Sequence, residues 1–201
     1  MPITSYSTLQ TAVVDWLEDR SDLAPFVPDF IAMAEGYFNT QLRVRQMETT
    51  APLTTSTAGA ASLPANFMEV IDVVSGVTNR PITYMTRGTG AAYYGGRGGQ
   101  GAFYGINGSS LQLYPGGASG LVLTYLSRIP ALSTTTTTNW LLQARPELYL
   151  RGALMMAAEF IKDNEEAAKQ KALVDMIIGQ MNMQDMRSRG RGGLQLRMAT
   201  P

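Results

Sequence analysis

Two groups of neighbouring carboxylates are the residues in this sequence of 201 residues whose types and spacing could do chemistry. Asp15, Glu18 and Asp19 form one group, and Glu165 and Glu166 form the other. Paired carboxylates can act as a general acid and base, or can bind magnesium. Carboxylates at helix ends are more often capping or solvated charges, because the helix dipole favours negative charge near the N-terminus. We therefore expect neither catalysis nor metal binding from them.

A glycine motif is the second pattern with chemical meaning. Gly96-Arg-Gly-Gly-Gln-Gly101 fits G-x-G-x-x-G, whose glycines let a pyrophosphate approach backbone N–H groups at the start of a helix. Here no helical pattern follows, and Leu121 stands about 20 residues further on, where an acidic ribose ligand is required. No G-x-x-x-x-G-K-[ST] loop is present either, so nucleotide binding is not expected.

The composition makes most enzyme classes improbable. The chain has no histidine, the commonest general base and zinc ligand, and no cysteine for disulfides or thiolate metal sites. No apolar run approaches the roughly 20 residues that cross a bilayer, and no charged-then-apolar N-terminal segment indicates export. We expect a non-enzymatic protein with no cofactor, metal or membrane partner, made in the cytoplasm.

Charge is unevenly placed along a chain whose formal net charge is zero. The first 48 residues hold seven acidic residues and three arginines, whereas the only charged residues after Asp185 are Arg187, Arg189, Arg191 and Arg197. The acidic and basic ends could attract one another between neighbouring copies. Arginine interspersed with glycine also fits single-stranded nucleic-acid binding, although the tail contains no aromatic side chain for stacking.

Helical spacing at the N-terminus predicts two short helices. The first covers about residues 5–20, is capped by Ser5 or Thr4, and carries apolar side chains at Leu9, Val13, Trp16 and Leu17. The second begins near Pro28 and continues to about Gln46, with an apolar stripe at Phe30, Ile31, Ala34, Phe38 and Leu42. The short turn between them predicts an antiparallel pair in which Trp16 and Leu17 are buried against the second helix.

In the middle of the chain, about residues 49–130, the apolar residues recur at every second position instead of at helical spacing. The β-branched run at Glu69–Ser75 and the alternating apolar residues at 111–113 and 121–125 predict strands, and Asn107-Gly108 predicts a hairpin. The glycine-rich segment 88–105 is expected to be a long mobile loop, because glycine loses the most backbone entropy on ordering.

Helical periodicity returns after the threonine run at residues 134–138. Pro146 fits the first turn of a helix that continues to about Lys162, with one side formed by Leu150, Ala153, Leu154, Ala157 and Ile161. A last helix should start at Asn164 and end near Arg187, with a buried or partner-facing side at Leu173, Met176, Ile177, Gln180 and Met181.

These elements predict an α+β, mainly α fold. It consists of a helical bundle, an inserted small antiparallel β subdomain and an extended C-terminal arm. The expected parts are residues 1–48, a helix pair; 49–130, the β insertion; 131–187, the helices that complete the bundle; and 188–201, the arm.

Six segments carry a family resemblance through their order along the chain. They are WLEDRSDLAP at 16–25, PDFIAMAE at 28–35, LRVRQME at 42–48, LPANFMEV at 63–70, YGINGSSLQLYPG at 104–116 and LTYLSRIPALS…TNWLL at 123–142. Taken in this order, over most of residues 5–185, they resemble the head-to-tail adaptor (connector) proteins of tailed bacteriophages.

This resemblance implies a structural virion protein at the head-tail interface. Identical subunits, twelve in the family, would form a ring under the portal protein, and a downstream tail or nozzle protein would bind the other side. DNA would pass through the channel without specific binding. The alternatives are a capsid decoration or tail-completion protein, or a single-stranded nucleic-acid-binding protein.

Two sets of contact residues are expected on this interpretation. The portal candidates begin at the end of the last helix and continue through the arm: Arg187, Arg189, Arg191, Leu194, Leu196, Arg197 and Met198. The candidates for contact with a tail component or a neighbour are in the glycine-rich loop: Arg87, Tyr93, Tyr94, Arg97 and Phe103.

Overall fold

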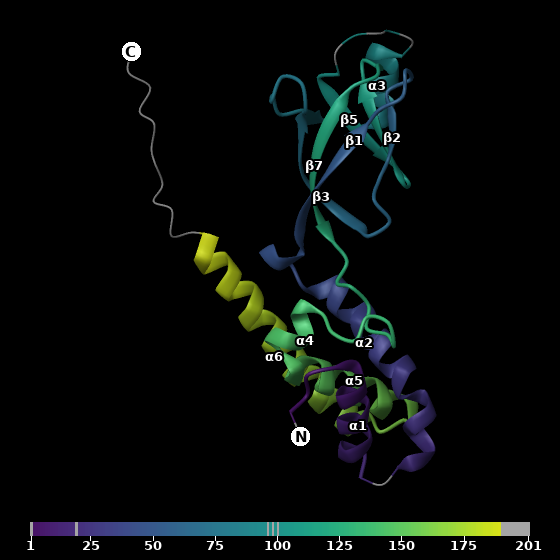
Figure 1. Cartoon of the computed structure of the whole chain (residues 1–201), viewed down its shortest axis with the longest axis vertical. Coiled ribbons are helices and arrows are strands. Elements are labelled where there is room, and N and C mark those ends of the chain that lie inside the picture. The colour runs from purple at the N-terminus through teal and green to yellow at the C-terminus, as the bar shows by residue number, and fades with distance from the viewer. Residues whose placement is uncertain (1, 19, 96, 98, 100, 190–201) are drawn as a thin grey trace. The chain divides into compact units, whose positions relative to one another are not determined.

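A computed structural model describes residues 2–18, 20–95, 97, 99 and 101–189. Helices take up 48% and strands 22% of the described residues, which confirms the expected α+β, mainly α class. The chain divides into a helical unit, Met1–Arg45 with Ile129–Pro201, and a β unit, Gln46–Arg128 (Figure 1).

The helical unit contains five α-helices and a 3₁₀ helix in its described residues. They are α1 (Tyr6–Trp16), the 3₁₀ helix Ser21–Phe26, α2 (Val27–Gln41), α4 (Trp140–Ala144), α5 (Pro146–Phe160) and α6 (Asn164–Arg189). The predicted helix starts at Ser5, Pro28, Pro146 and Asn164 are confirmed to within a residue. At the first of them, the Ser5 hydroxyl accepts from the backbone N–H of Thr8 and the Thr8 hydroxyl accepts from Ser5, a reciprocal cap.

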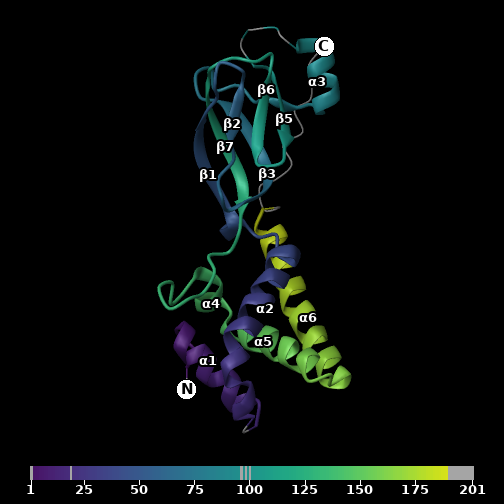
Figure 2. The same cartoon turned by 90° about the vertical axis from the view of Figure 1, so that its right-hand side faces the viewer.

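The core of this unit lies where α2 packs on α5, beside α6 (Figure 2). The whole predicted stripe of α2, from Phe30 to Leu42, is buried. Gly152 allows the close approach, because a Cβ atom there would lie 2.5 Å from the ring of Phe38. The Phe38 ring also meets the ring of Tyr149 edge to face, with centroids 5.4 Å apart. The helical periodicity of the sequence therefore identifies the buried face of α2 correctly, but the main partner of that face is α5 rather than the expected first helix.

Several expectations for this unit are wrong. The first helix ends at Trp16, and the Trp16 side chain is 54% exposed rather than buried against α2. The buried residues of α1 are Leu9 and Val13. This helix packs on α5 as well as on α2. Ile161, expected on the buried side of α5, lies beyond that helix and is 38% exposed.

The β unit contains seven strands and one α-helix in its described residues, after the short 3₁₀ helix Arg45–Met47 at its start. They are β1 (Glu48–Thr54), β2 (Ala60–Ser62), β3 (Phe67–Ser75), β4 (Thr83–Tyr84), α3 (Arg87–Tyr94), β5 (Phe103–Asn107), β6 (Ser110–Tyr114) and β7 (Gly120–Ser127). One sheet has the order β1-β7-β3 and the other β2-β6-β5-β4. All pairings are antiparallel except β4 with β5. Residues from both sheets share one apolar core.

The predicted hairpin at Asn107-Gly108 is confirmed as the turn between β5 and β6. Asn107 pairs with Ser110, and Gly108 has φ of 59°, in the left-handed region that glycine adopts without strain. The register then places Leu111 and Leu113 in the core. This turn therefore sets which face of β6 is buried.

The expected loop over 88–105 is partly wrong, because α3 occupies Arg87–Tyr94 and β5 begins at Phe103. Gly90 lies against the Tyr114 ring, so closely that a Cβ atom at Gly90 would be 2.5 Å from it. Tyr94 stacks on Phe103 with ring centroids 5.8 Å apart. These tertiary contacts offset the entropy that argues against order in a glycine-rich segment.

Candidate interaction surfaces

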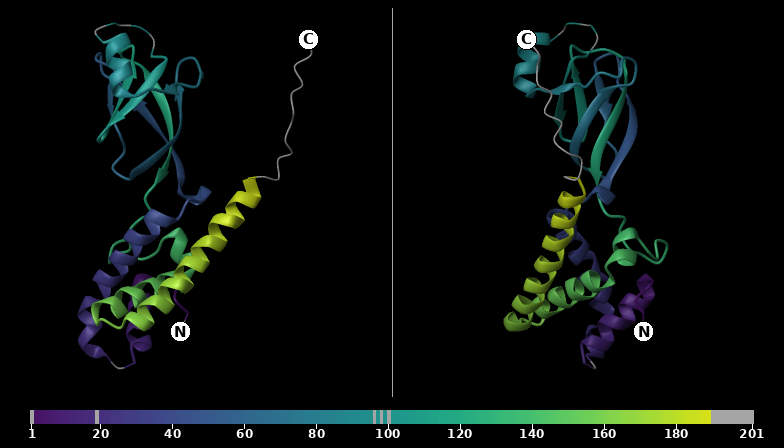
Figure 3. Two further views of the ribbon diagram at one scale, coloured as in Figure 1. Left: turned by 180° about the vertical axis from the view of Figure 1, so that it is seen from behind. Right: turned by 90° about the vertical axis from the view of Figure 1, so that its left-hand side faces the viewer.

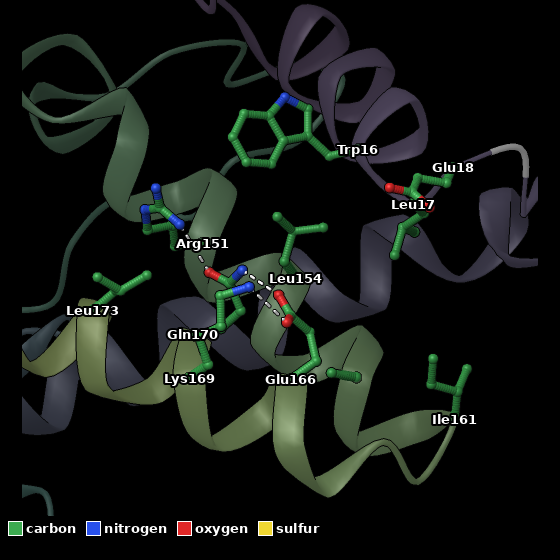
Figure 4. Close-up of a pocket in the computed structure, with 11 residues that line it drawn as sticks. Trp16, Leu17, Glu18, Arg151, Leu154, Ile161, Glu166, Lys169, Gln170 and Leu173 are labelled. Atoms are coloured by element: carbon green, nitrogen blue, oxygen red, sulfur yellow. Dashed lines mark hydrogen bonds and ion pairs between the residues drawn. The ribbon is translucent and has the colours of Figure 1, made fainter.

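A groove in the helical unit is lined by residues of α1, α5 and α6 and by the residues just after α1 and α5 (Figure 4). Its cavity volume is about 460 Å³, and the lining comprises Trp16, Leu17, Glu18, Arg151, Leu154, Ala158, Ile161, Glu166, Lys169, Gln170 and Leu173. Most of these side chains are apolar or carry long apolar stems. Such a surface favours contact with another apolar surface rather than with water.

A chain of polar contacts holds the walls of the groove in place. The Arg151 guanidinium lies over the ring of Trp16, 5.9 Å from its centroid, and donates to Gln170 Oε1 at 3.1 Å. Gln170 Nε2 donates to Glu166 Oε1 at 2.7 Å, and Lys169 Nζ donates to Glu166 Oε2 at 2.9 Å. The Trp16 ring is therefore held at the surface by Arg151.

The carboxylates considered for catalysis differ in their exposure and in their hydrogen-bond partners. A hydrogen bond from Gln170 and, to a smaller extent, one from Lys169 lower the pKa of the Glu166 carboxyl. Asp15, Glu18 and Glu165 are exposed, and Asp19 lies outside the described residues. Across the described ranges, no three acidic side chains are grouped so as to hold a metal ion. The described part of the glycine motif does not form the start of a helix, since α3 ends before it.

The exposed face of α6 is rich in methionine. Met176, Met183 and Met186 have 52%, 53% and 71% of their side chains exposed, and Arg187 follows them on the same helix. We call these four residues the methionine face. Unbranched methionine side chains adapt to differently shaped partners, and several exposed together mark an interaction surface. The helical spacing predicts Met176 on a buried or partner-facing side, and its exposure shows that it is not buried.

Residues 41–45, which lead from α2 toward β1, are held on the last turns of α6. Asn182 Oδ1 accepts from the backbone N–H of Arg43 at 3.0 Å, and Asp185 Oδ1 accepts from that of Arg45 at 3.2 Å. Asp185 Oδ2 also accepts from Arg189 Nε at 2.6 Å. Although burial acts to raise it, these donors hold the pKa of Asp185 below its ordinary value.

The portal candidates are only partly described. Arg187 and Arg189 lie on α6 rather than in an extended arm, which corrects the expected start of the arm at residue 188. Arg189 is ion-paired with Asp185 and so belongs to the structure of the helix end. The other candidates, Arg191, Leu194, Leu196, Arg197 and Met198, lie outside the described residues.

The candidates of the glycine-rich segment lie on and after α3. Arg87, Tyr93 and Tyr94 are on the helix, and Tyr93 is 68% exposed. Tyr94 and Arg97 line a second pocket, of about 360 Å³, with Leu113 and Tyr114 of β6 among the other lining residues. Phe103 stacks on Tyr94. The structure therefore brings Tyr94, Arg97 and Phe103 together and leaves Tyr93 projecting.

A buried polar network, which the sequence did not predict, surrounds Glu35. Glu35 Oε1 accepts from the Tyr149 hydroxyl and from the backbone N–H of Leu132, both at 2.9 Å. Asn139 Nδ2 donates to the Tyr149 hydroxyl at 2.6 Å and to Pro130 O at 2.7 Å. Burial raises the pKa of the Glu35 carboxyl. The network holds the segment between β7 and α4 against α2 and α5, and its only sequence signal was an acidic residue inside an apolar stripe.

Comparison with protein-family models matches residues 4–197 to the family described as SU10 adaptor protein. Comparison with curated proteins gives no match. Within the described residues, none of the helices combines the length and apolar character needed to span a bilayer.

Proposed function

Because this chain belongs to the SU10 adaptor protein family, a family of phage head-to-tail adaptors, we propose that it joins the DNA-filled head of a tailed phage to its tail. The observation that carries the proposal is the family match over residues 4–197. The protein would be a structural component of the virion at the head-tail interface, without enzymatic activity.

The proposed assembly is a ring of identical subunits, twelve as in the family resemblance, docked under the portal protein. The exposed tryptophan of the groove and the exposed methionines of α6 support it, because repeated subunits would cover such apolar surface. The zero formal net charge supports a channel through which DNA slides, since tight phosphate binding would retard it.

The portal anchor in this proposal is the segment after α6. Its Arg191, Leu194, Leu196, Arg197 and Met198 combine charge with apolar side chains at alternate positions, as in strands that add to a partner's sheet edge. Arg187 and Arg189 are left out of the anchor because α6 already contains them.

The β unit would face the next tail component in this arrangement. Tyr93, which projects from α3, and Arg97 are the contact residues that we propose there. Tyrosine and arginine are both enriched at the energetic centres of protein interfaces.

The test is electron microscopy of the purified chain, alone and mixed with portal rings of the same phage. We expect rings of the chain coaxial with the portal. A chain that ends at Arg189 should keep the parent's helix content and melting temperature but should not co-sediment with portal rings. Portal binding by this shortened chain would refute the anchor while leaving the adaptor role intact.

The same preparation tests the alternative functions. Binding to capsids without portal would indicate a decoration protein, and binding to finished tails alone would indicate a tail-completion protein. Binding of single-stranded oligonucleotide, lost in the chain that ends at Arg189, would indicate a nucleic-acid-binding tail.

A further inference from the structure

We infer that the groove formed by α1, α5 and α6 binds the C-terminal part of α6 from a second copy of this chain. The inference rests on the proposed ring, because subunits related by rotation about a ring axis contact one another through two different surfaces. The groove would be one of these surfaces, and the methionine face would be the other.

The groove offers apolar surface beside negative charge. The Trp16 ring is more than half exposed, and Arg151 holds it in that position. Residues 159–166, which connect α5 to α6 and include the lining residues Ile161 and Glu166, contain four acidic residues and one basic residue. Of the charged lining residues, Glu18 and Glu166 are balanced by Arg151 and Lys169, so the excess of negative charge comes from the other carboxylates of residues 159–166. A complementary partner would therefore be apolar and basic.

The C-terminal part of α6 has this character. Met183 and Met186 are exposed, and Arg187 is next to them. Asn182 and Asp185 hold the backbone of residues 43–45 against this part of the helix, which brings two more arginines there. Segments 43–45 and 182–189 together contain four arginines and one acidic residue, Asp185, which is buried.

The length of α6 decides between the same copy and a second copy. α6 is one continuous helix in both views of Figure 3. Gln170 lines the groove, and Met186 follows it 16 residues later in the sequence. At 1.5 Å per residue they are about 24 Å apart along the helix axis. One copy therefore cannot place its own Met186 in its own groove, whereas a second copy can.

The two surfaces suit one another physically. Thioether sulfur makes favourable contacts with aromatic rings, so Met183 and Met186 fit beside Trp16. Opposite charges around the apolar contact fix its direction and disfavour groove-to-groove pairing, in which carboxylates would meet carboxylates. A groove-to-helix contact repeated with rotation closes a ring rather than a two-fold dimer.

Chemical cross-linking tests the contact directly, because the natural chain has no cysteine. One population carries Glu18→Cys and the other Arg187→Cys, and a bismaleimide is added to their mixture on portal rings of the same phage. We expect cross-links between positions 18 and 187 to exceed 18–18 and 187–187 cross-links about tenfold. Val77→Cys, which is exposed in the β unit, replaces either variant as the matched control.

A charge exchange provides the second test. Glu18→Lys and Arg187→Glu should each weaken self-association about tenfold, the effect of about 1.4 kcal/mol per contact. An equal mixture of the two variants should restore it, because every contact in an alternating ring then pairs lysine with glutamate or glutamate with arginine. Both residues are exposed, so both variants should keep the parent's melting temperature.

The outcomes separate this inference from the adaptor role. Rings on the portal without excess 18–187 cross-links, or a mixture that does not restore self-association, overturn the groove contact and leave the adaptor role standing. Strong 18–187 cross-links in a chain that never docks on the portal support the contact and overturn the adaptor role. The absence of both rings and cross-links would overturn the groove contact and the adaptor role together.

Discussion

Trp16 shows at the scale of one residue how a side chain with the spacing of a core residue can lie at the surface. It follows Leu9 and Val13 at helical spacing, yet only those two are buried. Arg151 of α5 stands over the indole and supplies a favourable contact that a buried site would otherwise provide. The residue that periodicity assigns to the core is thereby available to a partner.

Substitution of Trp16 should accordingly cost little stability. Trp16→Ala removes a half-exposed ring and one cation–π contact, so the free energy of unfolding should fall by about 1 kcal/mol or less. Phe38→Ala, the control, removes a fully buried ring and should cost about 3 to 5 kcal/mol. Urea denaturation followed by circular dichroism measures both values. Equal losses would show that Trp16 is a core residue after all.

Glu35 gives a pH dependence whose sign follows from its burial. Its carboxyl pKa is raised in the folded protein from an ordinary value of 4.5. The folded state therefore binds the proton more tightly than the unfolded state. The contribution of Glu35 to stability is then fully present below pH 4.5 and is lost as the pH rises through the folded pKa.

The variant Glu35→Gln removes this titration while its amide oxygen can still accept from Tyr149 and Leu132. The stability of the parent minus that of Glu35→Gln should therefore decrease as the pH rises from 4 to 7. Parallel stability curves for the two proteins, measured by denaturant titration at each pH, would contradict the raised pKa.

At the scale of elements, α3 is a helix in a segment where the glycine-rich sequence predicts a loop. Tertiary contacts stabilise the helix there. Gly88 and Gly90 are both on this helix, but their surroundings differ. Gly88 has open space where a Cβ atom would be, whereas a Cβ atom at Gly90 would meet the Tyr114 ring. Packing on β6 thus selects glycine at one position and not at the other.

Two alanine substitutions in α3 should consequently have opposite effects. Gly88→Ala should stabilise by about 0.5 to 1 kcal/mol, because alanine loses less backbone entropy in a helix. Gly90→Ala should destabilise by about 1 to 3 kcal/mol, because the methyl group displaces the Tyr114 ring. Thermal unfolding followed by tyrosine fluorescence compares them. A gain in stability from Gly90→Ala would show that α3 does not pack on β6.

The groove marks the limit of what could be predicted at this scale. The apolar stripe of α2, the helix starts and the hairpin at Asn107-Gly108 follow from local spacing and turn chemistry, which one segment contains in full. The groove requires Trp16 of α1 to meet Arg151 of α5 and Gln170 of α6, two helices that lie more than 100 residues further along the chain. Their pairing depends on the tertiary packing of α1 and α6 on α5, for which the sequence has no local pattern.

At the scale of the whole molecule, the chain divides into two units because the β segment is inserted between two helical segments. The β unit is one continuous segment, whereas the helical unit is assembled from the segments before and after it. The adaptor residues that we assign to neighbour and portal contacts belong to the helical unit, and Tyr93 and Arg97 belong to the β unit. The two kinds of contact should therefore be separable by cutting the chain.

We predict that residues 46–128 fold without the rest of the chain. β1 and β7, at the two ends of this segment, pair along their lengths from Glu48 with Leu126 to Thr54 with Gly120. The segment also has its own apolar core, drawn from both sheets, in which Val73, Leu111 and Leu123 are fully buried. About 80 residues with such a core are enough for an independent domain, although one of modest stability.

The excised segment should unfold cooperatively on heating, and Leu123→Asp, which places a charge in its core, should abolish the transition. In solution it should neither self-associate nor co-sediment with portal rings, because the groove, the methionine face and the segment after α6 are all absent from it.

The excised segment should still bind the downstream tail component if Tyr93 and Arg97 make that contact. Tyr93→Ala should weaken this binding and leave the melting temperature unchanged, since the ring is exposed. A segment that has no cooperative transition would show that the β unit depends on the helices, whereas a folded segment that binds the portal would move the anchor out of the helical unit.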